Sequence, residues 1–219
     1  MSVSATDLQV LHGLFNDACK KKYHGTPIKT TYSNEIATRL ILGMIITVAA
    51  RLDITAVPIF VETNQHYYRV YLRILHKPDT RNLIGFISHC KNCGNRTATL
   101  ESEPACKLCG SEQKIAGPLW IGALFEKEFV ESMLMEMPNH SVDKKCEKSL
   151  QKCVLESEMP ACYYTLDEIA EILKRSPIPL QEIISRLEKN GFSSSPTSFN
   201  PTGFRTNCTI DKIKELFTH

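Results

Sequence analysis

The sequence of 219 residues lacks an uncharged apolar run as long as a typical membrane span. Its longest uncharged apolar run lies between Arg39 and Arg51, which is roughly half of the ~20 residues that a membrane span needs. The start, Met1 to Ser4, lacks the basic residues and apolar run of a secretory signal peptide. We therefore predict a cytoplasmic chain with no membrane partner, in which the apolar run forms a buried core helix.

An excess of charge of either sign is also lacking, because 26 Lys and Arg residues face 24 Asp and Glu residues. This balance does not indicate a nucleic-acid partner, and it does not exclude one, since a local basic patch is enough. The nine cysteines are an odd number and follow no secretion signal. Such cysteines favour a reducing compartment, where closely spaced pairs bind metal rather than form disulfides.

The first helix is predicted from Leu8 to Cys19, with Asp7 as its N-terminal cap. At helical spacing its large apolar residues share one side: Leu8, Leu11, Leu14 and Phe15. A basic loop is expected to follow over residues 20–25, where three lysines occur in a row.

A second helix and two strands are predicted next. Ser33 or Asn34 is expected to cap a helix that ends near Leu52, and residues 54–62 and 66–74 have the composition of strands. The second strand alternates between an apolar face (Val70, Leu72, Ile74) and a basic, aromatic face (Arg69, Tyr71, Arg73). We therefore expect it to be half buried.

Two Cys-x-x-Cys-Gly units, at Cys90–Gly94 and Cys106–Gly110, are the most specific motif in the chain. Two residues between paired cysteines let both sulfurs face one ion, and the glycine accepts the backbone twist that follows. Four thiolates fill a tetrahedral zinc site and leave no position open for water, so the predicted Zn²⁺ is structural. The predicted ligands are Cys90, Cys93, Cys106 and Cys109.

Other residues near this motif leave alternatives open. His89 directly precedes the first cysteine and is a competing ligand. Basic residues close in sequence are expected to offset the charge of the thiolates: Lys91, Arg96, Lys107 and Lys114. The five remaining cysteines have no metal-binding spacing and are interpreted as buried or idle thiols: Cys19, Cys146, Cys153, Cys162 and Cys208.

The second half of the chain is predicted to be mostly helical. Gly117-Pro118 is expected to form a turn, residues 125–137 a helix, and residues 139–158 a surface helix or linker. Thr165 and Glu168 have the spacing of a capping box. A later helix has a buried stripe that ends before Gly191: Leu180, Ile183, Ile184 and Leu187. Helix, turn, helix and an extended arm together suggest a winged-helix fold.

Several segments resemble one enzyme family. The run Ile115–Leu124, directly after the cysteine motif, resembles the tRNA (guanine-26) dimethyltransferases. Four further segments are similar to the same family and occur in the same order: the Thr-Asp turn at Ala5–Asp7, the His-Glu-x-x-x-Arg helix at Asn34–Leu42, the Asp-His-Tyr-x-Arg-Val strand at Gln65–Tyr71 and the C-terminal signature at Phe199–Thr206.

The chain also departs from this family. Asn34 stands where the family commonly has His, and Gln65 where it commonly has Asp. The sequence contains no Asp-Pro-Phe-Gly catalytic motif and no glycine-rich strand-to-helix turn before residue 90. The resemblance therefore implies the C-terminal half of such an enzyme, without the half that binds S-adenosylmethionine.

The predicted fold class is α/β (or α+β), in three parts. Residues 1–84 are expected to form the C-terminal part of a class I Rossmann-like methyltransferase domain, and residues 85–116 a zinc-binding module. Residues 117–219 are expected to form a family-specific C-terminal domain with a winged-helix-like tail over residues 164–219. The two cysteine pairs are the only internal repeat that we find.

The resemblance implies dimethylation of the exocyclic amine of guanine 26 in tRNA, with S-adenosylmethionine as the cofactor of the complete enzyme. No catalytic residue is assigned, this chain alone is expected to be inactive, and a separate N-terminal methyltransferase chain is a candidate partner. The candidate tRNA contacts are Lys20, Lys21, Lys22, Lys29, Arg69, Tyr71, Arg73 and Arg205, since Lys and Arg neutralise phosphates and Tyr stacks on bases.

Alternatives to these assignments remain open. The lysines can belong to a solvated face, and the arginines can form ion pairs with local carboxylates. At the level of function, the alternatives are a non-catalytic, zinc-containing tRNA-binding protein and a transcription adaptor with a zinc ribbon and a winged helix.

Overall fold

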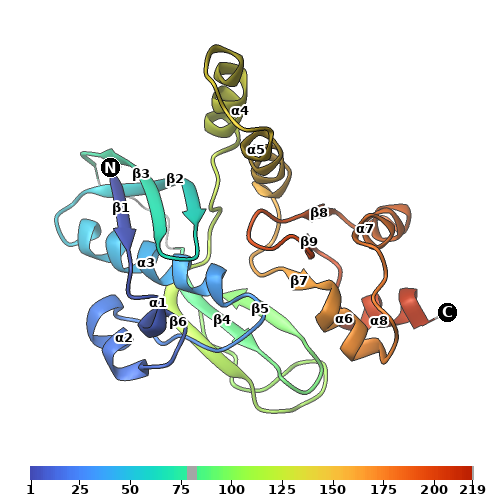
Figure 1. Ribbon diagram of the computed structural model, residues 1–219. Helices are drawn as coiled ribbons and strands as arrows, with labels where there is room; N and C mark the ends of the chain where they lie inside the picture. Colours follow the sequence, from blue (N-terminus) through green and yellow to red (C-terminus); the bar gives the residue numbers. More distant parts are fainter. Residues whose placement is uncertain (78–82, 219) are drawn as a thin grey trace. The chain divides into compact units, whose positions relative to one another are not determined.

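The structure is a computed structural model that describes residues 1–77 and 83–218, and it divides into two compact units, Met1–Leu124 and Phe125–His219. The first unit contains, in chain order, β1 (Ser2–Ala5), α1 (Leu8–Leu11), α2 (Asn16–Tyr23), α3 (Ser33–Ala50), β2 (Thr55–Thr63), β3 (Tyr68–Leu75), β4 (Ile84–His89), β5 (Arg96–Thr99) and β6 (Lys114–Trp120). The second contains α4 (Lys127–Glu136), a 3-10 helix (Met137–Asn139), α5 (Lys144–Glu156), β7 (Tyr164–Thr165), α6 (Leu166–Leu173), α7 (Leu180–Lys189), β8 (Ser194–Pro196), β9 (Gly203–Thr206) and α8 (Ile210–Thr218) (Figure 1).

The first unit has three layers, with α3 between two three-stranded sheets (Figure 1). One sheet has the order β1-β3-β2 and the other the order β5-β4-β6. In the first sheet β3 is antiparallel to both neighbours, so β1 and β2 run parallel to each other. The strands expected over residues 54–62 and 66–74 are confirmed, with ends that differ from β2 and β3 by at most about two residues. Successive side chains of a strand point to opposite faces of the sheet, so the alternating apolar residues share one face.

Helix α3 is long and apolar enough to cross a membrane by length and composition alone, yet 56% of this stretch is buried inside the protein. It packs against β2, β3 and β6. A buried ion pair joins Arg39 Nε to Glu35 Oε1 at 2.9 Å, and Arg39 Nη1 donates to the carbonyls of Trp120 and Gly122. The prediction of a buried core helix is therefore confirmed, and its arginine ties the helix to the end of β6.

The cap that the sequence predicts for α3 is wrong. The N-cap residue is Tyr32, and its side chain makes no cap hydrogen bond. Ser33 Oγ instead donates to the carbonyl of Thr30 and accepts from its amide. The Ser33 side chain thus closes the preceding turn.

The prediction of one helix from Leu8 to Cys19 is also wrong, because the chain turns at Gly13 and forms α1 and α2 separately. Gly13 has φ +80°, a left-handed conformation that favours glycine. The expected basic loop is helical as far as Tyr23. Asp7 does occupy the N-cap position of α1, as predicted, but its side chain makes no cap hydrogen bond. Its carboxylate accepts instead from the Tyr23 hydroxyl and, at 3.0 Å, from Lys22 Nζ.

The predicted turn at Gly117-Pro118 lies inside strand β6 and has a cis peptide bond. Gly117 pairs there with Thr26, through two backbone hydrogen bonds of 2.9 Å. Strand β6 pairs with β4 both before and after the Gly117-Pro118 bond. The first compact unit continues beyond this strand to Leu124. The three-part division at residues 84 and 116 stays a prediction.

The second unit begins with helices α4 and α5 and continues with the sheet β7-β9-β8 and helices α6, α7 and α8. Thr165 Oγ1 accepts from the amide of Glu168 at 3.3 Å, which confirms one half of the predicted capping box. The predicted stripe of α7 is confirmed by the burial of Ile183, Ile184 and Leu187. The fold is mixed α and β; the Rossmann-like and winged-helix assignments stay predictions.

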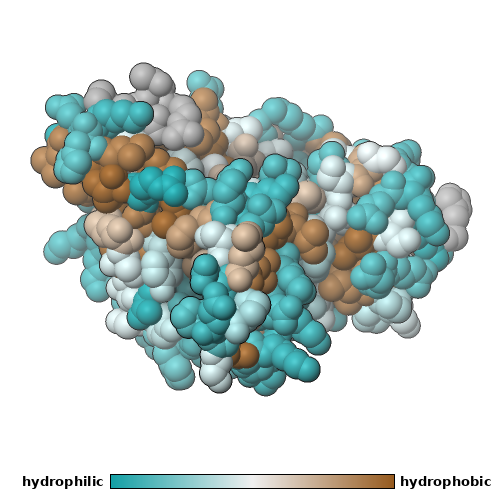
Figure 2. Space-filling view, turned by 90° about the horizontal axis from the view of Figure 1, so that it is seen from above, coloured by the Kyte–Doolittle hydropathy of each residue, from teal (hydrophilic) through white to brown (hydrophobic). Residues whose placement is uncertain are grey.

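Figure 2 shows hydrophobic residues gathered in a continuous area at the left of this face, over the first unit, with further ones among hydrophilic residues elsewhere. The largest exposed fractions belong to Met135 and Leu52, at 78% and 66%.

Candidate metal centre and RNA-contacting residues

The two cysteine loops have the same backbone hydrogen bonds. In the first, the amide of Cys90 donates to the carbonyl of Asn95, and the amide of Gly94 donates to that of Cys90. In the second, Cys106 and Ser111 form the equivalent pair, and Gly110 donates to Cys106, with all four distances at 2.8 or 2.9 Å. Both glycines have positive φ, so the predicted role of glycine is confirmed.

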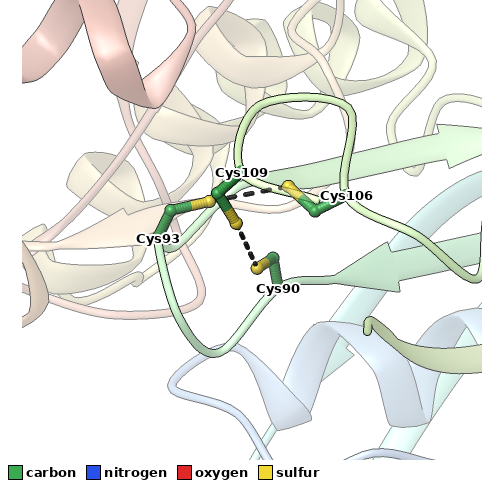
Figure 3. A group of neighbouring side chains, drawn as sticks. All are labelled: Cys90, Cys93, Cys106 and Cys109. Carbon is green, nitrogen blue, oxygen red and sulfur yellow. Dashed lines mark hydrogen bonds between the residues drawn. The ribbon is translucent and has the colours of Figure 1, made fainter. Parts of the chain in front are cut away.

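The four thiols of these loops converge on one centre (Figure 3). Their sulfur atoms all lie within 4.8 Å of one another. The sulfurs of Cys90 and Cys109 are 3.5 Å apart and those of Cys93 and Cys106 are 3.6 Å apart. Zinc–sulfur bonds of about 2.3 Å in a tetrahedron place sulfurs about 3.8 Å apart. The donor set and its spacing therefore fit one Zn²⁺.

The environment of the thiols differs between the two loops. Hydrogen bonds from the side chain and backbone of Ser111 lower the pKa of Cys109 to about 5. Burial raises the pKa of Cys93 to about 12. Because metal binding requires thiolates, a divalent cation has to displace the protons that these thiols carry.

Two asparagines that sequence reasoning missed also contact the sulfurs. Asn92 Nδ2 donates to Cys109 Sγ at 3.6 Å and to Ser111 Oγ at 3.2 Å, and Asn95 Nδ2 donates to Cys106 Sγ at 3.8 Å. Each asparagine comes from the first loop and contacts the second. Such contacts orient metal ligands. One indication of them is present in the sequence, since Asn92 lies between the two cysteines of the first loop and Asn95 follows the second of them by two residues.

The competing ligand His89 is directed elsewhere. Its Nδ1 is 3.0 Å from the Tyr32 hydroxyl, and its ring meets that of Tyr32 edge to face. Burial, together with the charges of Arg96 and Lys91, lowers the pKa of His89 to about 4. Among the described residues the candidate ligand group contains cysteines alone, and four of the five remaining cysteines are buried.

The cations expected to offset the thiolates have other contacts as well. Lys107 forms an ion pair with Glu103, and the Arg96 guanidinium lies over the Tyr32 ring at 4.6 Å. Lys107 therefore links the second loop to the segment just before it, and Arg96 links the first loop to Tyr32 at the start of α3.

The basic and aromatic face of β3 has the alternation that the sequence predicts. Tyr68, Val70 and Leu72 are buried, whereas Arg69 and Tyr71 are partly exposed and Arg73 is exposed. Arg69 Nε donates to Ser4 Oγ on β1 at 2.8 Å. The Arg69 guanidinium also stacks over the Tyr67 ring at 4.9 Å. This face places two cationic side chains and an aromatic one on a single strand.

The four candidate lysines are exposed. Lys20, Lys21 and Lys22 lie on α2, and Lys29 follows that helix. Burial alone would raise the pKa of Asp7, but hydrogen bonds from Tyr23 and Lys22 lower it below its usual value. Lys22 thus partly serves to hold Asp7, whereas RNA contact by the four lysines stays a prediction.

Arg205 is a correction to the list of RNA contacts. Its side chain is 3% exposed, and its Nε donates to Glu156 Oε2 at 2.6 Å. Its Nη1 donates to the carbonyl of Pro160, and the guanidinium lies against the Phe199 ring. A guanidinium enclosed in this way cannot reach a phosphate, so the structure favours the alternative interpretation, a buried ion pair.

Comparisons with known proteins give one consistent result. The family model described as N2,N2-dimethylguanosine tRNA methyltransferase matches residues 1–218. The tRNA (guanine(26)-N(2))-dimethyltransferase of Methanobrevibacter smithii is 32% identical over 226 residues, which cover 99% of this chain and 58% of the relative. The tRNA (guanine(26)-N(2)/guanine(27)-N(2))-dimethyltransferase of Aquifex aeolicus is 31% identical over 97% of this chain and 56% of its own length.

A solved structure is similar over the same extent. The complex of Trm1 from Pyrococcus horikoshii with S-adenosyl-L-methionine matches with a TM-score of 0.83 and 26% identity, over 98% of this chain and 58% of that chain. The chain thus spans a little under three fifths of the length of these relatives. Because the family match runs through both structural units rather than one motif, the chain belongs to the N2,N2-dimethylguanosine tRNA methyltransferase family.

Proposed function

We propose that this chain acts in the S-adenosylmethionine-dependent dimethylation of the exocyclic amine of guanine in tRNA, as the portion that carries a structural zinc centre and holds the tRNA. The observation that carries the proposal is the family match over residues 1–218. The activity is proposed rather than transferred, because the chain spans 58% of the length of the first relative.

The chemistry sets clear demands on such an enzyme. The exocyclic amine of guanine is a weak nucleophile, because its lone pair delocalises into the ring, so it has to be oriented and must lose a proton. The base must also leave its stack, which costs a few kcal/mol. S-adenosylmethionine supplies an electrophilic methyl group. The sequence offers no Asp-Pro-Phe motif, so we assign none of these chemical steps to a residue of this chain.

The residues of this chain have the chemistry to bind and orient RNA. Arg69 and Arg73 on β3 offer cations to phosphates, and Tyr71 between them offers a ring for a splayed base. Four thiols at zinc distances would fix the two loops next to β4 and β6. Strand β3 lies antiparallel between two parallel strands, an arrangement compatible with the edge of a mostly parallel methyltransferase sheet.

Methyl transfer tests the proposal directly. Unmodified tRNA and labelled S-adenosylmethionine are incubated with this chain alone, and with this chain plus the part of the Methanobrevibacter smithii relative that lies outside the match. We expect no transfer by the chain alone and dimethylguanine formation by the mixture. The comparisons give no support for a natural separate partner chain, so the added part serves only to supply the cofactor site.

The outcome also distinguishes the alternative function. A folded mixture that binds tRNA but transfers no methyl group would contradict the catalytic proposal and favour a non-catalytic tRNA-binding protein. Effective competition by duplex DNA for the tRNA site would instead favour a transcription adaptor.

A further inference from the structure

The turn between α1 and α2 exposes two consecutive large apolar residues. Leu14 and Phe15 are 54% and 55% exposed, although helical spacing predicts that they face the core together with Leu11. Leu11 alone of these three is buried. The left-handed Gly13 redirects the chain after α1, and the next two side chains point outward as a result.

The turn is held rigidly from both sides. On the α2 side, Cys19 and Tyr23 are buried, and both Tyr23 and Lys22 bind the Asp7 carboxylate. On the α1 side, the amide of Leu14 donates to the carbonyl of Gln9 at 3.0 Å. Phe15 is thus presented by a fixed backbone, which lowers the entropy cost of using it as a contact.

A cavity of about 400 Å³ opens at this turn, lined by Gly13, Leu14, Phe15, Asn16, Asp17 and Ala18. The apolar and aromatic side chains suit the flat face of a base. Asp17 in the wall repels phosphate, so the cavity favours a base rather than the RNA backbone. Its carboxylate and the Asn16 amide can hydrogen-bond a base edge.

One lysine lies beside this turn, and two more lie in the last turn of the helix that follows it. A methyl group placed at Gly13 would lie 3.8 Å from Cγ of Lys29, so the stem of this lysine runs beside the turn. Lys20 and Lys21 are exposed on α2, the helix that begins at the turn. We call the set Leu14, Phe15, Lys20, Lys21 and Lys29 the α1–α2 surface. It combines an aromatic platform with cations, the combination that binds unpaired nucleotides.

Helix α1 begins three residues after the carboxyl end of β1, so the turn follows closely on that end of the strand. From these observations we propose that the α1–α2 surface docks an unstacked nucleotide of the RNA substrate. Phe15 stacks on the base, while Lys20, Lys21 and Lys29 neutralise the flanking phosphates. The proposal rests on the proposed function, in that it takes tRNA as the partner.

Affinity as a function of salt concentration tests this proposal. The tRNA affinity of the 219-residue chain is compared with that of Phe15→Ala, Phe15→Trp and the matched control Leu155→Ala, which removes an equally exposed apolar side chain on α5. Loss of one stacked base weakens binding by about five-fold to 150-fold. We expect this loss for Phe15→Ala at every salt concentration with an unchanged salt slope, while Phe15→Trp and Leu155→Ala retain the affinity of the original chain.

The outcomes separate the two proposals. If the original chain does not bind tRNA, the proposed function and this inference both fail. If the original chain binds tRNA and Phe15→Ala binds equally well, only the inference is overturned. Concentration-dependent self-association that disappears in Phe15→Ala would assign the surface to a second copy of the chain and would also overturn it.

A spectroscopic readout adds independent evidence. The chain has a single tryptophan, Trp120, which is buried. An indole at position 15 is therefore the main exposed fluorophore of Phe15→Trp, and stacking on a base is expected to quench it. A tRNA titration that changes its emission no more than that of the original chain would contradict stacking at this turn.

Discussion

The cysteine loops of the first unit and the sheet β7-β9-β8 of the second are both built on short strands, yet different interactions hold them. Strand β5 beside the loops is only partly buried along its length. The second sheet packs instead on a cluster of apolar residues from α6, α7, α8 and β9, among them Leu187, Phe204 and Phe217. The loops depend on convergent thiols, whereas the second sheet depends on apolar burial.

The candidate RNA-contacting arginines of the two units also lie in different environments. On β3 of the first unit, Arg69 and Arg73 keep contact with solvent. In the second unit Arg205 is enclosed with Glu156 by the rings of Tyr163 and Phe199. We therefore expect RNA binding to depend on the first unit, and the charge on Arg205 to matter only for folding.

Metal removal is expected to have the largest effect. Structural zinc in small modules contributes about 10–16 kcal/mol of apparent binding free energy. Cys106→Ser, or chelation, should abolish bound zinc and make residues 90–110 sensitive to protease, while the second unit keeps its protection. Elemental analysis and limited proteolysis measure both changes. Cys146→Ser, at an exposed cysteine outside the candidate ligand group, should retain one zinc per chain, and loss of zinc there would contradict the assignment.

Removal of the buried guanidinium should have the next largest effect. Arg205→Ala leaves the Glu156 carboxylate buried without its cation, which costs about 3–5 kcal/mol of the free energy of unfolding. Urea denaturation of the second unit measures this cost. The matched control is Arg186→Ala, since Arg186 pairs with Glu182 on an exposed helix surface, where a pair contributes about 0.3–0.5 kcal/mol. A loss of stability no greater than that of the control would contradict the interpretation of Arg205 as a buried structural residue.

The exposed lysines should have the smallest effect on stability and a specific effect on binding. Lys20→Ala, Lys21→Ala and Lys29→Ala are expected to leave the free energy of unfolding unchanged. Each should reduce the slope of log affinity for tRNA against log salt by about 0.7–0.9, because one phosphate contact is lost. Lys174→Ala, at an exposed lysine of the second unit, should leave the slope unchanged. Equal slopes for all four variants would place RNA binding elsewhere.

The sequence predicts most reliably the features that depend on near neighbours. The two cysteine loops close through hydrogen bonds within six residues, and the alternation on β3 follows from strand geometry. The Thr165 cap needs only Glu168, three residues away. In these cases the contacts join residues only a few positions apart, so the residue spacing is enough to predict them.

Features that depend on distant partners were missed. Asp7 is a residue type that often caps helices with its side chain, but here Tyr23 and Lys22 of α2 donate hydrogen bonds to its carboxylate. Glu156 lies 49 residues before Arg205, so the ion pair that buries Arg205 is not visible in the sequence. The break at Gly13 was missed because the apolar spacing of residues 8–15 suits one helix, whereas the left-handed Gly13 separates two, the second of which buries Cys19 and Tyr23.

The salt dependence of tRNA affinity is the measurement that tests the central claim most directly. If the first unit holds tRNA through cations, log affinity of the zinc-loaded chain should fall linearly with log salt, with a slope of about −0.7 to −0.9 per phosphate contact, and duplex DNA should compete poorly. An affinity that stays flat across salt concentrations, or equal competition by duplex DNA, would contradict the claim that this chain is the tRNA-holding portion of a guanine dimethyltransferase.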